Sequence, residues 1–246
     1  GALLASAHDV GREYRVMKAL AGTDVPVPRM YHYCDRDELL GTSFYVMEFV
    51  AGRVFMDPAL PGMTPADRDA IYREMNRVIA ALHAVDYREV GLGDYGREGN
   101  YVGRQIARWS RQCRESTLPM NDAMHRLMDW LPAHLPSGDE TRLVHGDYRM
   151  DNLVFHPTEP RIVGVLDWEL STLGHPLADL AYHCMAWRVP PSLWRGIGGL
   201  DLPALGIPSE TDYIAWYSAA TGRDVADQWD YYLAYNLFRM AAILHG

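Results

Sequence analysis

The chain has 246 residues and a formal net charge of −9, from 23 Lys and Arg against 32 Asp and Glu. A nucleic-acid-binding protein needs a basic face, so this balance disfavours a nucleic-acid partner. The three cysteines, Cys34, Cys113 and Cys184, are far apart and form no C-x-x-C pair, which predicts a reducing compartment, the cytoplasm.

No membrane span is expected. The longest apolar-looking region, residues 231–244, is interrupted by Asn236 and Arg239, whereas a span needs about 20 mostly apolar residues. A chain of this length is able to bury a sizeable core, as one bilobal domain or two small ones.

The first part of the chain predicts one helix followed by two strands. Residues 6–20 have helical apolar spacing, with Glu13 in the apolar face, where a carboxylate is costly unless it meets a cation. Residues 25–33 are expected to form an edge strand, because their two prolines cannot donate to a ladder. Residues 44–50, FYVMEFV, are β-branched and aromatic and predict a second strand.

The rest of the chain predicts mainly helices. Thr64 and Pro65 are a hydroxyl N-cap and a first-turn proline, and apolar residues recur from Ile71 to about Ala84. Residues 91–96 match G-x-G-x-x-G, but they follow a helix and not a strand, so we interpret them as a connecting loop. Further helices are expected at residues 104–113, 121–135, 176–187, 209–220 and 224–245.

The segment that carries chemistry is residues 143–168, LVHGDYRMDNLVFHPTEPRIVGVLDW. A loop with His145, Asp147 and Asn152 precedes a predicted hairpin, and the hairpin ends at Asp167. Transfer of a phosphoryl group needs a carboxylate that positions the acceptor hydroxyl and side chains that hold divalent ions against the phosphates. The order and spacing of these residues predict such a site.

The loop resembles that of a known enzyme family. Protein kinases have H-R-D-x-x-x-x-N, whereas Gly146 here replaces the Arg, as in the H-G-D-x-x-x-x-N loop of the aminoglycoside phosphotransferase and choline kinase family. Asp167-x-Glu169 resembles the family's metal-binding segment. Gly174-His175-Pro176-x-x-Asp179-Leu180-Ala181 resembles its G-x-P-x-x-D-L-A segment, whose Asp braces the catalytic loop.

The resemblance implies a role for each of these residues. Asp147 would orient the acceptor hydroxyl and accept its proton, and His145 and Asp179 would support the loop. Mg²⁺ would be held by Asn152 and Asp167, with Glu169 as a weaker candidate. Arg149 would lie near the transferred phosphate, although a salt bridge to a neighbouring carboxylate is an equal alternative.

The resemblance also assigns a nucleotide side. Glu13 would be the helix glutamate that pairs with a strand lysine, unless it is a surface residue turned to water. Met47 would line the adenine pocket, and the Glu48 carbonyl and Val50 amide would face the adenine edge; an ordinary core strand is the alternative. Residues 1–12 contain no Lys and only two glycines, so we expect the first lobe to be truncated before its lysine strand and phosphate loop.

We therefore predict an α+β protein-kinase-like bilobal fold. Residues 1–50 would form part of a small N-lobe, and residues 51–246 a mainly helical C-lobe that carries the catalytic hairpin. The expected activity is ATP- and Mg²⁺-dependent transfer of the γ-phosphoryl group to a small-molecule hydroxyl. A nucleotide-binding or interaction module without turnover is the alternative.

Two observations bear on the acceptor and on a partner. Aromatic residues near the loop suggest an apolar or acyl-bearing acceptor; the candidates for contact are Tyr148, Trp168 and Tyr182, with Trp187 and Trp194 nearby. Within the family, the motif segments resemble most the kinase-like domains fused to, or encoded beside, acyl-CoA dehydrogenases. This points to a hydroxyacyl compound as acceptor and to a functional association with such a dehydrogenase.

Overall fold

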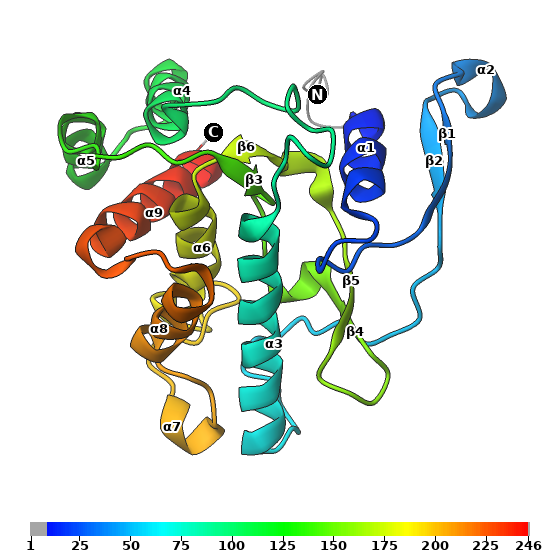
Figure 1. Ribbon diagram of the computed structural model, residues 1–246. Coiled ribbons are helices and arrows are strands. Elements are labelled where there is room, and N and C mark those ends of the chain that lie inside the picture. Colours follow the sequence, from blue (N-terminus) through cyan, green and yellow to red (C-terminus); the bar gives the residue numbers. More distant parts are fainter. Residues whose placement is uncertain (1–8, 246) are drawn as a thin grey trace.

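The computed structural model describes residues 9–245, which form a small strand-containing part and a larger, mainly helical part (Figure 1). The first part contains α1 (Val10–Leu20), β1 (Met30–Cys34), α2 (Asp37–Leu40) and β2 (Phe44–Met47). The second contains α3 (Pro65–Ala84), α4 (Tyr101–Glu115), α5 (Asp122–Ala133), β3 (Arg142–Val144), η1 (Met150–Asn152), β4 (Leu153–Phe155), β5 (Ile162–Val165), η2 (Trp168–Leu170), β6 (Thr172–Gly174), α6 (Pro176–Cys184), η3 (Met185–Trp187), α7 (Leu202–Leu205), α8 (Glu210–Thr221), η4 (Ala226–Gln228) and α9 (Trp229–His245).

The first part is a two-stranded antiparallel sheet beside one helix. α1 begins after Asp9, whose carboxylate accepts from the first free N–H groups of the helix; residues 6–8 of the predicted helix lie outside the described residues. The predicted edge strand begins at Met30 and not at residue 25, because the Pro-containing stretch before it stays irregular. The second predicted strand ends at Met47, three residues early, so Glu48 and Val50 lie in the segment that follows β2.

The long helix α3 lies in the middle of the second part, between α8 and the β4–β5 hairpin (Figure 1). Its predicted start is confirmed: Thr64 and Asp67 form a capping box, in which the Thr64 hydroxyl accepts from the Asp67 N–H. Such a cap contributes about 1 kcal/mol to helix stability. The apolar face of α3 is buried as the periodicity predicts, and α8 packs against it.

Three short antiparallel strand pairs are present in the described chain, namely β1 with β2, β3 with β6, and β4 with β5. The β4–β5 hairpin is the one predicted from the sequence, and Leu153 pairs with Val165 in it. Arg53 forms a bridge to Phe155, with two main-chain hydrogen bonds of 2.8 Å, so the segment after β2 is tied to this hairpin. The predicted division at residue 50 lies just before this tie and remains a prediction.

The C-terminal helices enclose the elements that support the loop. α6 is buried along its whole length and packs against α9, as its nearly continuous apolar sequence predicts. The predicted last helix is shorter at its start, beginning at Trp229 with the 3₁₀ turn η4 before it. Cys34, Cys113 and Cys184 are free and buried. Within residues 9–245, no helix combines the length and apolar character that a membrane span requires.

Candidate active site

One buried carboxylate holds the main chain of the loop between β3 and η1. Asp179, near the start of α6, is 4% exposed and accepts from the N–H groups of His145 and Gly146, both at 2.8 Å. Burial acts to raise the pKa of Asp179, but its contacts with His83 and His145, foremost the hydrogen bond from His83, outweigh burial, so the pKa lies below the ordinary aspartate value. An ionised carboxylate therefore fixes the loop's main chain.

Two histidines complete this support. His83 on α3 approaches Asp179 through Nε2 at 3.2 Å and Tyr217 through Nδ1 at 2.8 Å, and burial lowers its pKa. A neutral ring that donates from Nε2 and accepts at Nδ1 satisfies both contacts. His145 reaches the Leu166 carbonyl through Nε2 at 2.9 Å, while its Nδ1 accepts from the Asp147 N–H at 3.2 Å. His145 thereby connects the loop to the end of β5.

Gly146 meets a conformational and a steric requirement. Its φ of +81° lies in the left-handed region that favours glycine. A Cβ at this position would lie 2.6 Å from the Leu170 carbonyl oxygen, closer than any contact that could persist. The backbone of the loop therefore excludes the arginine that protein kinases have here.

Asp147, the predicted base, is surrounded by three donors. Arg149 approaches its Oδ1 through Nε at 2.7 Å and donates to its Oδ2 from a terminal nitrogen at 2.9 Å. Tyr182 donates to Oδ1 at 2.5 Å, and the Asn152 amide nitrogen lies 3.3 Å from Oδ2. Thus the salt bridge that was the alternative for Arg149 is present in the structure.

Two of the predicted metal ligands lie at neighbouring strand ends. The Asn152 amide nitrogen donates to the Asp147 carbonyl at 2.9 Å, which directs its amide oxygen to the other side. Leu166 donates its N–H to the Asn152 carbonyl at 2.9 Å, and exposed Asp167 follows with φ +63°. These are hard oxygen donors of the kind that Mg²⁺ uses when phosphates supply other ligands. Glu169 is half-buried in η2.

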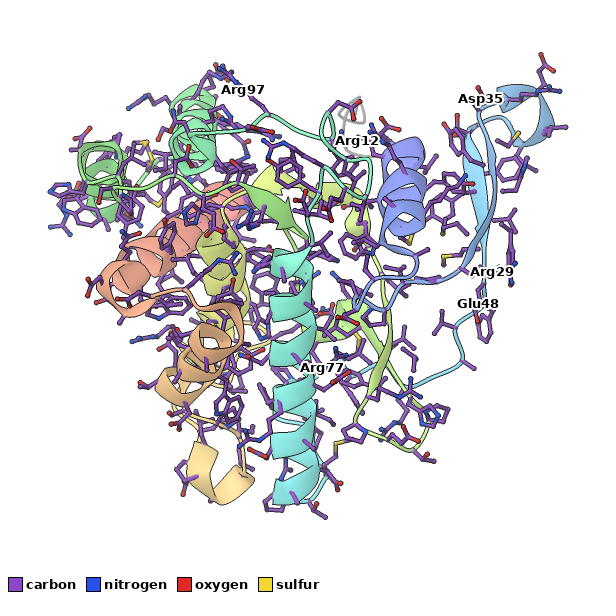
Figure 2. The ribbon with its side chains drawn as sticks, viewed as in Figure 1. Arg12, Arg29, Asp35, Glu48, Arg77 and Arg97 are labelled. Carbon is purple, nitrogen blue, oxygen red and sulfur yellow. The ribbon has the colours of Figure 1, made fainter. Side chains whose placement is uncertain are left out.

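The predicted nucleotide residues belong to α1 and to the end of β2 with the segment after it. The Tyr45 hydroxyl donates to Glu13 at 3.1 Å, and burial, then the charges of Glu13 and Asp167, raise the pKa of Tyr45 to about 12. The helix that carries Glu13 packs against η2, and Arg12 donates to the Ser171 carbonyl. Met47 and Glu48 are exposed. The Arg29 N–H donates to the Glu48 carboxylate and the Glu48 N–H donates to the Arg29 carbonyl, and the two residues lie side by side (Figure 2).

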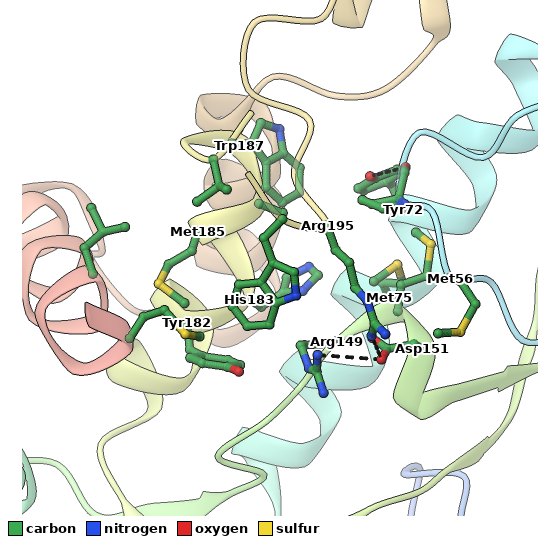
Figure 3. A pocket seen from close by; sticks show the side chains of 17 residues that line it. Met56, Tyr72, Met75, Arg149, Asp151, Tyr182, His183, Met185, Trp187 and Arg195 are labelled. Carbon is green, nitrogen blue, oxygen red and sulfur yellow. Dashed lines mark hydrogen bonds and ion pairs between the residues drawn. The ribbon is translucent and has the colours of Figure 1, made fainter. Parts of the chain in front are cut away.

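A mainly apolar pocket with a cavity volume of about 90 Å³ is lined in part by residues of η1 and η3 (Figure 3). Arg149 and Tyr182, which both contact Asp147, belong to its wall. Arg195 and Arg149 each pair with Asp151 at one side of it. Five methionines line the rest together with three aromatic rings, namely Met56, Met75, Met150, Met185, Met240, Tyr72, Trp187 and Trp194.

Two of the three residues predicted to contact the acceptor are placed differently by the structure. Tyr148 and Trp168 are 0% exposed, and both use their polar atoms inside the protein: the Tyr148 hydroxyl donates to the Met75 carbonyl and the Trp168 indole N–H to the Val165 carbonyl. They belong to the core and do not line the pocket. Burying a large aromatic side chain stabilises the fold more than leaving it exposed, and this is why both residues face the core. Tyr182 does line the pocket.

Sequence reasoning missed the methionines, Asp151, Arg195 and Arg239. The five methionines come from five separate parts of the chain and share no spacing, so no periodic signal marks them. Asp151 lies within the motif and could have been singled out, because a second acid near Asp147 predicts a salt bridge to an arginine. Arg239 was visible only as the residue that interrupts an apolar stretch; it is buried and donates to the Gly146 carbonyl at 3.1 Å.

Three features define the class of kinase-like phosphotransferases. They are a carboxylate on a supported loop (Asp147), a pair of oxygen donors after it (Asn152 and Asp167), and a strand-containing part beside it. A family model described as the phosphotransferase enzyme family matches residues 2–208, and the chain belongs to this family. The fold is the predicted α+β kinase-like fold.

A crystal structure from Ralstonia eutropha, of a protein described as a candidate aminoglycoside phosphotransferase, is 59% identical with a TM-score of 0.94 and covers 96% of this chain and 73% of that one. Aminoglycoside 2′-phosphotransferase-IIIa in its GDP complex has a TM-score of 0.68 at 16% identity, covering 97% and 74% of the two chains, and shares the fold.

The relatives similar along the whole chain are larger proteins. Acyl-CoA dehydrogenase family member 10 of Mus musculus is 46% identical, and the chain spans 23% of its length. Acyl-CoA dehydrogenase family member 11 of Homo sapiens is 41% identical, and the chain spans 32% of its length. The association with acyl-CoA dehydrogenases predicted from the motifs is thereby confirmed at the level of sequence relationship.

Proposed function

We propose that this chain is an ATP- and Mg²⁺-dependent phosphotransferase that moves the γ-phosphoryl group to a hydroxyl of a small, largely apolar molecule. The observation that carries the proposal is the position of Asp147. It stands on a loop whose main chain is fixed by Asp179, and two of its three partners form the wall of a methionine-lined pocket.

The chemistry assigned to Asp147 follows from its surroundings. In phosphoryl transfer the acceptor hydroxyl must point at the phosphorus, and its proton must be accepted late. A carboxylate at the edge of the pocket would perform both tasks for a hydroxyl that enters from the pocket. Arg149 lies within reach of the same space, and its charge would stabilise the transferred group once it leaves Asp147.

Asn152 and Asp167 would hold the metal, with Glu169 as a weaker candidate. Held there, Mg²⁺ would supply positive charge that offsets the negative charge of the phosphates. The fit rests on the orientation of the Asn152 amide. Its nitrogen donates to the Asp147 carbonyl, so the amide oxygen of Asn152 faces away from that carbonyl. Two protein oxygens suffice for Mg²⁺ when phosphates and water complete its octahedron.

The nucleotide would lie between the two parts of the chain. Met47 would line the adenine, and the main chain of Glu48 and Val50 would face its edge, since these residues follow β2 before the chain joins the hairpin at Arg53. Glu13 would pair with a cation near the phosphates; its bond from Tyr45, whose pKa is also raised by the charge of Asp167, supports this.

The pocket supports an apolar acceptor over a cationic one. Methionine side chains adapt to flexible aliphatic chains, and the aromatic rings add apolar area. An aminoglycoside or choline would instead need carboxylates, yet Asp151 is already paired with two arginines. A hydroxyacyl compound fits this lining, and the dehydrogenase relatives support a functional association with an acyl-CoA dehydrogenase. Three free cysteines support a cytoplasmic location.

The test is an ATP-consumption screen of the full-length protein with Mg²⁺ against aminoglycosides, choline-like alcohols, sugars, and hydroxy acids or their CoA esters. We expect turnover with hydroxyacyl compounds. Asp147→Asn keeps the side chain's shape and should leave ATP affinity within a few-fold while lowering turnover about 10²–10⁴-fold.

Other outcomes separate the alternatives. A nucleotide-binding or interaction module would bind ATP without turnover in both proteins. Equal turnover in the parent and the Asp147→Asn protein would refute the role of Asp147, and turnover confined to aminoglycosides or choline-like alcohols would refute the apolar acceptor.

A further inference from the structure

We infer that Tyr182 is a positioning residue that fixes the orientation of the Asp147 carboxylate, and that Arg239 of α9 holds Tyr182 in place. The inference rests on the proposed function, because it concerns the residue assigned there as the base.

Tyr182 and Asp179 act on the same loop from the same helix. They are three residues apart on α6, so they lie on one face of it. Asp179 binds the loop's main chain at His145 and Gly146, and Tyr182 binds the side chain of the next residue, with its hydroxyl 2.5 Å from Asp147 Oδ1. One helix face thus fixes both the backbone and the carboxylate.

The hydroxyl of Tyr182 is a stable donor. Burial, then the charge of Asp147, raises the pKa of Tyr182 above the ordinary tyrosine value, so the phenol stays protonated at physiological pH. Charge-assisted hydrogen bonds of this kind are short and about twice as strong as neutral ones. An unconstrained aspartate carboxylate rotates over a broad range about its last torsion. The bond from Tyr182 restricts that rotation.

Arg149 cannot provide this restraint throughout the reaction. It contacts both oxygens of Asp147 in this structure, but its proposed task is to stabilise charge on the transferred phosphoryl group. If Arg149 moves to the phosphate, Tyr182 still holds Oδ1. The oxygen left to face the acceptor is then Oδ2, whose remaining contact is the long 3.3 Å approach of the Asn152 amide.

Arg239 explains why Tyr182 keeps its position. Its guanidinium lies 4.9 Å from the centre of the Tyr182 ring, and it donates to the Gly146 carbonyl at 3.1 Å. Arg239 is 8% exposed, so this cation is removed from water and its interaction with the ring is strengthened. It therefore ties Tyr182 and the loop to the same point on α9.

The experiment compares Tyr182→Phe with the matched control Tyr231→Phe in the full-length protein, with Mg·ATP and hydroxyhexanoic acid or its CoA ester as the probe acceptor. Tyr231 is a buried tyrosine on α9 that donates to the Leu131 carbonyl at 2.8 Å, away from the loop. We expect Tyr182→Phe to lower kcat about 10–100-fold, the loss of one hydrogen bond to a charged group, with KM for ATP unchanged. Tyr231→Phe should leave kcat within about twofold of the parent.

Arg239→Met tests the second half of the inference. If Arg239 acts through Tyr182, it should lower kcat in the parent but much less in the Tyr182→Phe background. Equal effects in both backgrounds would overturn the link between the two residues. An unchanged kcat for Tyr182→Phe, or a parallel loss of kcat, ATP affinity and melting temperature, would overturn the positioning role.

A crystal structure of the Tyr182→Phe protein in the Arg149→Met background, where no arginine contacts both oxygens of Asp147, keeps the test independent of turnover. We expect its Asp147 carboxylate to be rotated or spread over several orientations. A carboxylate that keeps its orientation overturns the inference, whether or not the parent is active. A parent inactive on every acceptor, with a reoriented Asp147 in the variant, would refute the proposed function and still support the positioning role.

Discussion

Removal of the Asp179 carboxylate should cost a large part of the protein's stability. Asp179 accepts from the N–H groups of His145 and Gly146 at 2.8 Å and from His83 Nε2 at 3.2 Å, and it is 4% exposed. In Asp179→Ala these donors remain buried without an acceptor. Each such group costs about 1–3 kcal/mol, so the expected loss for the three donors is about 3–9 kcal/mol, against a total stability of about 5–15 kcal/mol for a typical domain.

Urea unfolding followed by tryptophan fluorescence measures this loss as a lower midpoint at unchanged slope. The matched control is Asp69→Ala, since Asp69 is an exposed acid on α3 that pairs with Arg73 at 2.7 Å. A surface pair of this kind contributes less than about 1 kcal/mol. A loss of under about 1 kcal/mol for Asp179→Ala, similar to the control, would refute the role of Asp179 as the loop's support.

Three further results are expected. Gly146→Ala should lower stability by about 1–3 kcal/mol and turnover with it, because its Cβ would lie 2.6 Å from the Leu170 carbonyl at φ +81°; an unchanged melting temperature would contradict this. ATP should raise the melting temperature only with Mg²⁺, and Asp167→Ala should remove that increment while the unliganded melting temperature stays nearly constant; a metal-independent shift that survives the substitution would count against Asp167 as a ligand. Burial lowers the pKa of His175 and of His183 to about 4, so between about pH 4 and about 6.5 the unfolded chain binds more protons than the folded one. The free energy of unfolding should therefore decrease as the pH falls through this window. His183→Gln should make the free energy of unfolding, measured with urea, depend less on pH, and an unchanged pH dependence would refute the assignment.

The arrangement of the loop and hairpin was predictable because it depends on local spacing. The distance from Asp147 to Asn152, the two strands of the hairpin and the acid after them all follow from neighbouring residues, and the structure brings these elements together. The Thr64 cap is similarly local, and it is present. Local signals specify which backbone groups need partners, and this information lies within a few residues.

The pocket was not predictable in the same way. Its wall joins Met56, Met75 and Met240, which are far apart in the sequence, and their proximity depends on how α3 packs on α8 and α9 on α6. The aromatic residues were recognised as a group, but the sequence does not say which rings face inward. Tyr148 and Trp168 each bond to a main-chain carbonyl in the core, a choice that depends on tertiary partners.

The glycine that separates this loop from that of protein kinases has a consequence for charge. Gly146 leaves no room for a side chain, so the cation that the H-R-D motif would supply from the loop cannot be there. Two arginines instead approach from either side: Arg149 from within the motif, on the Asp147 carboxylate, and Arg239 from α9, on the Gly146 carbonyl. Because Arg239 belongs to the C-terminal helix, the loop depends on a residue almost a hundred positions away. The short motif therefore specifies the geometry of this loop only together with the packing of α9 against α6.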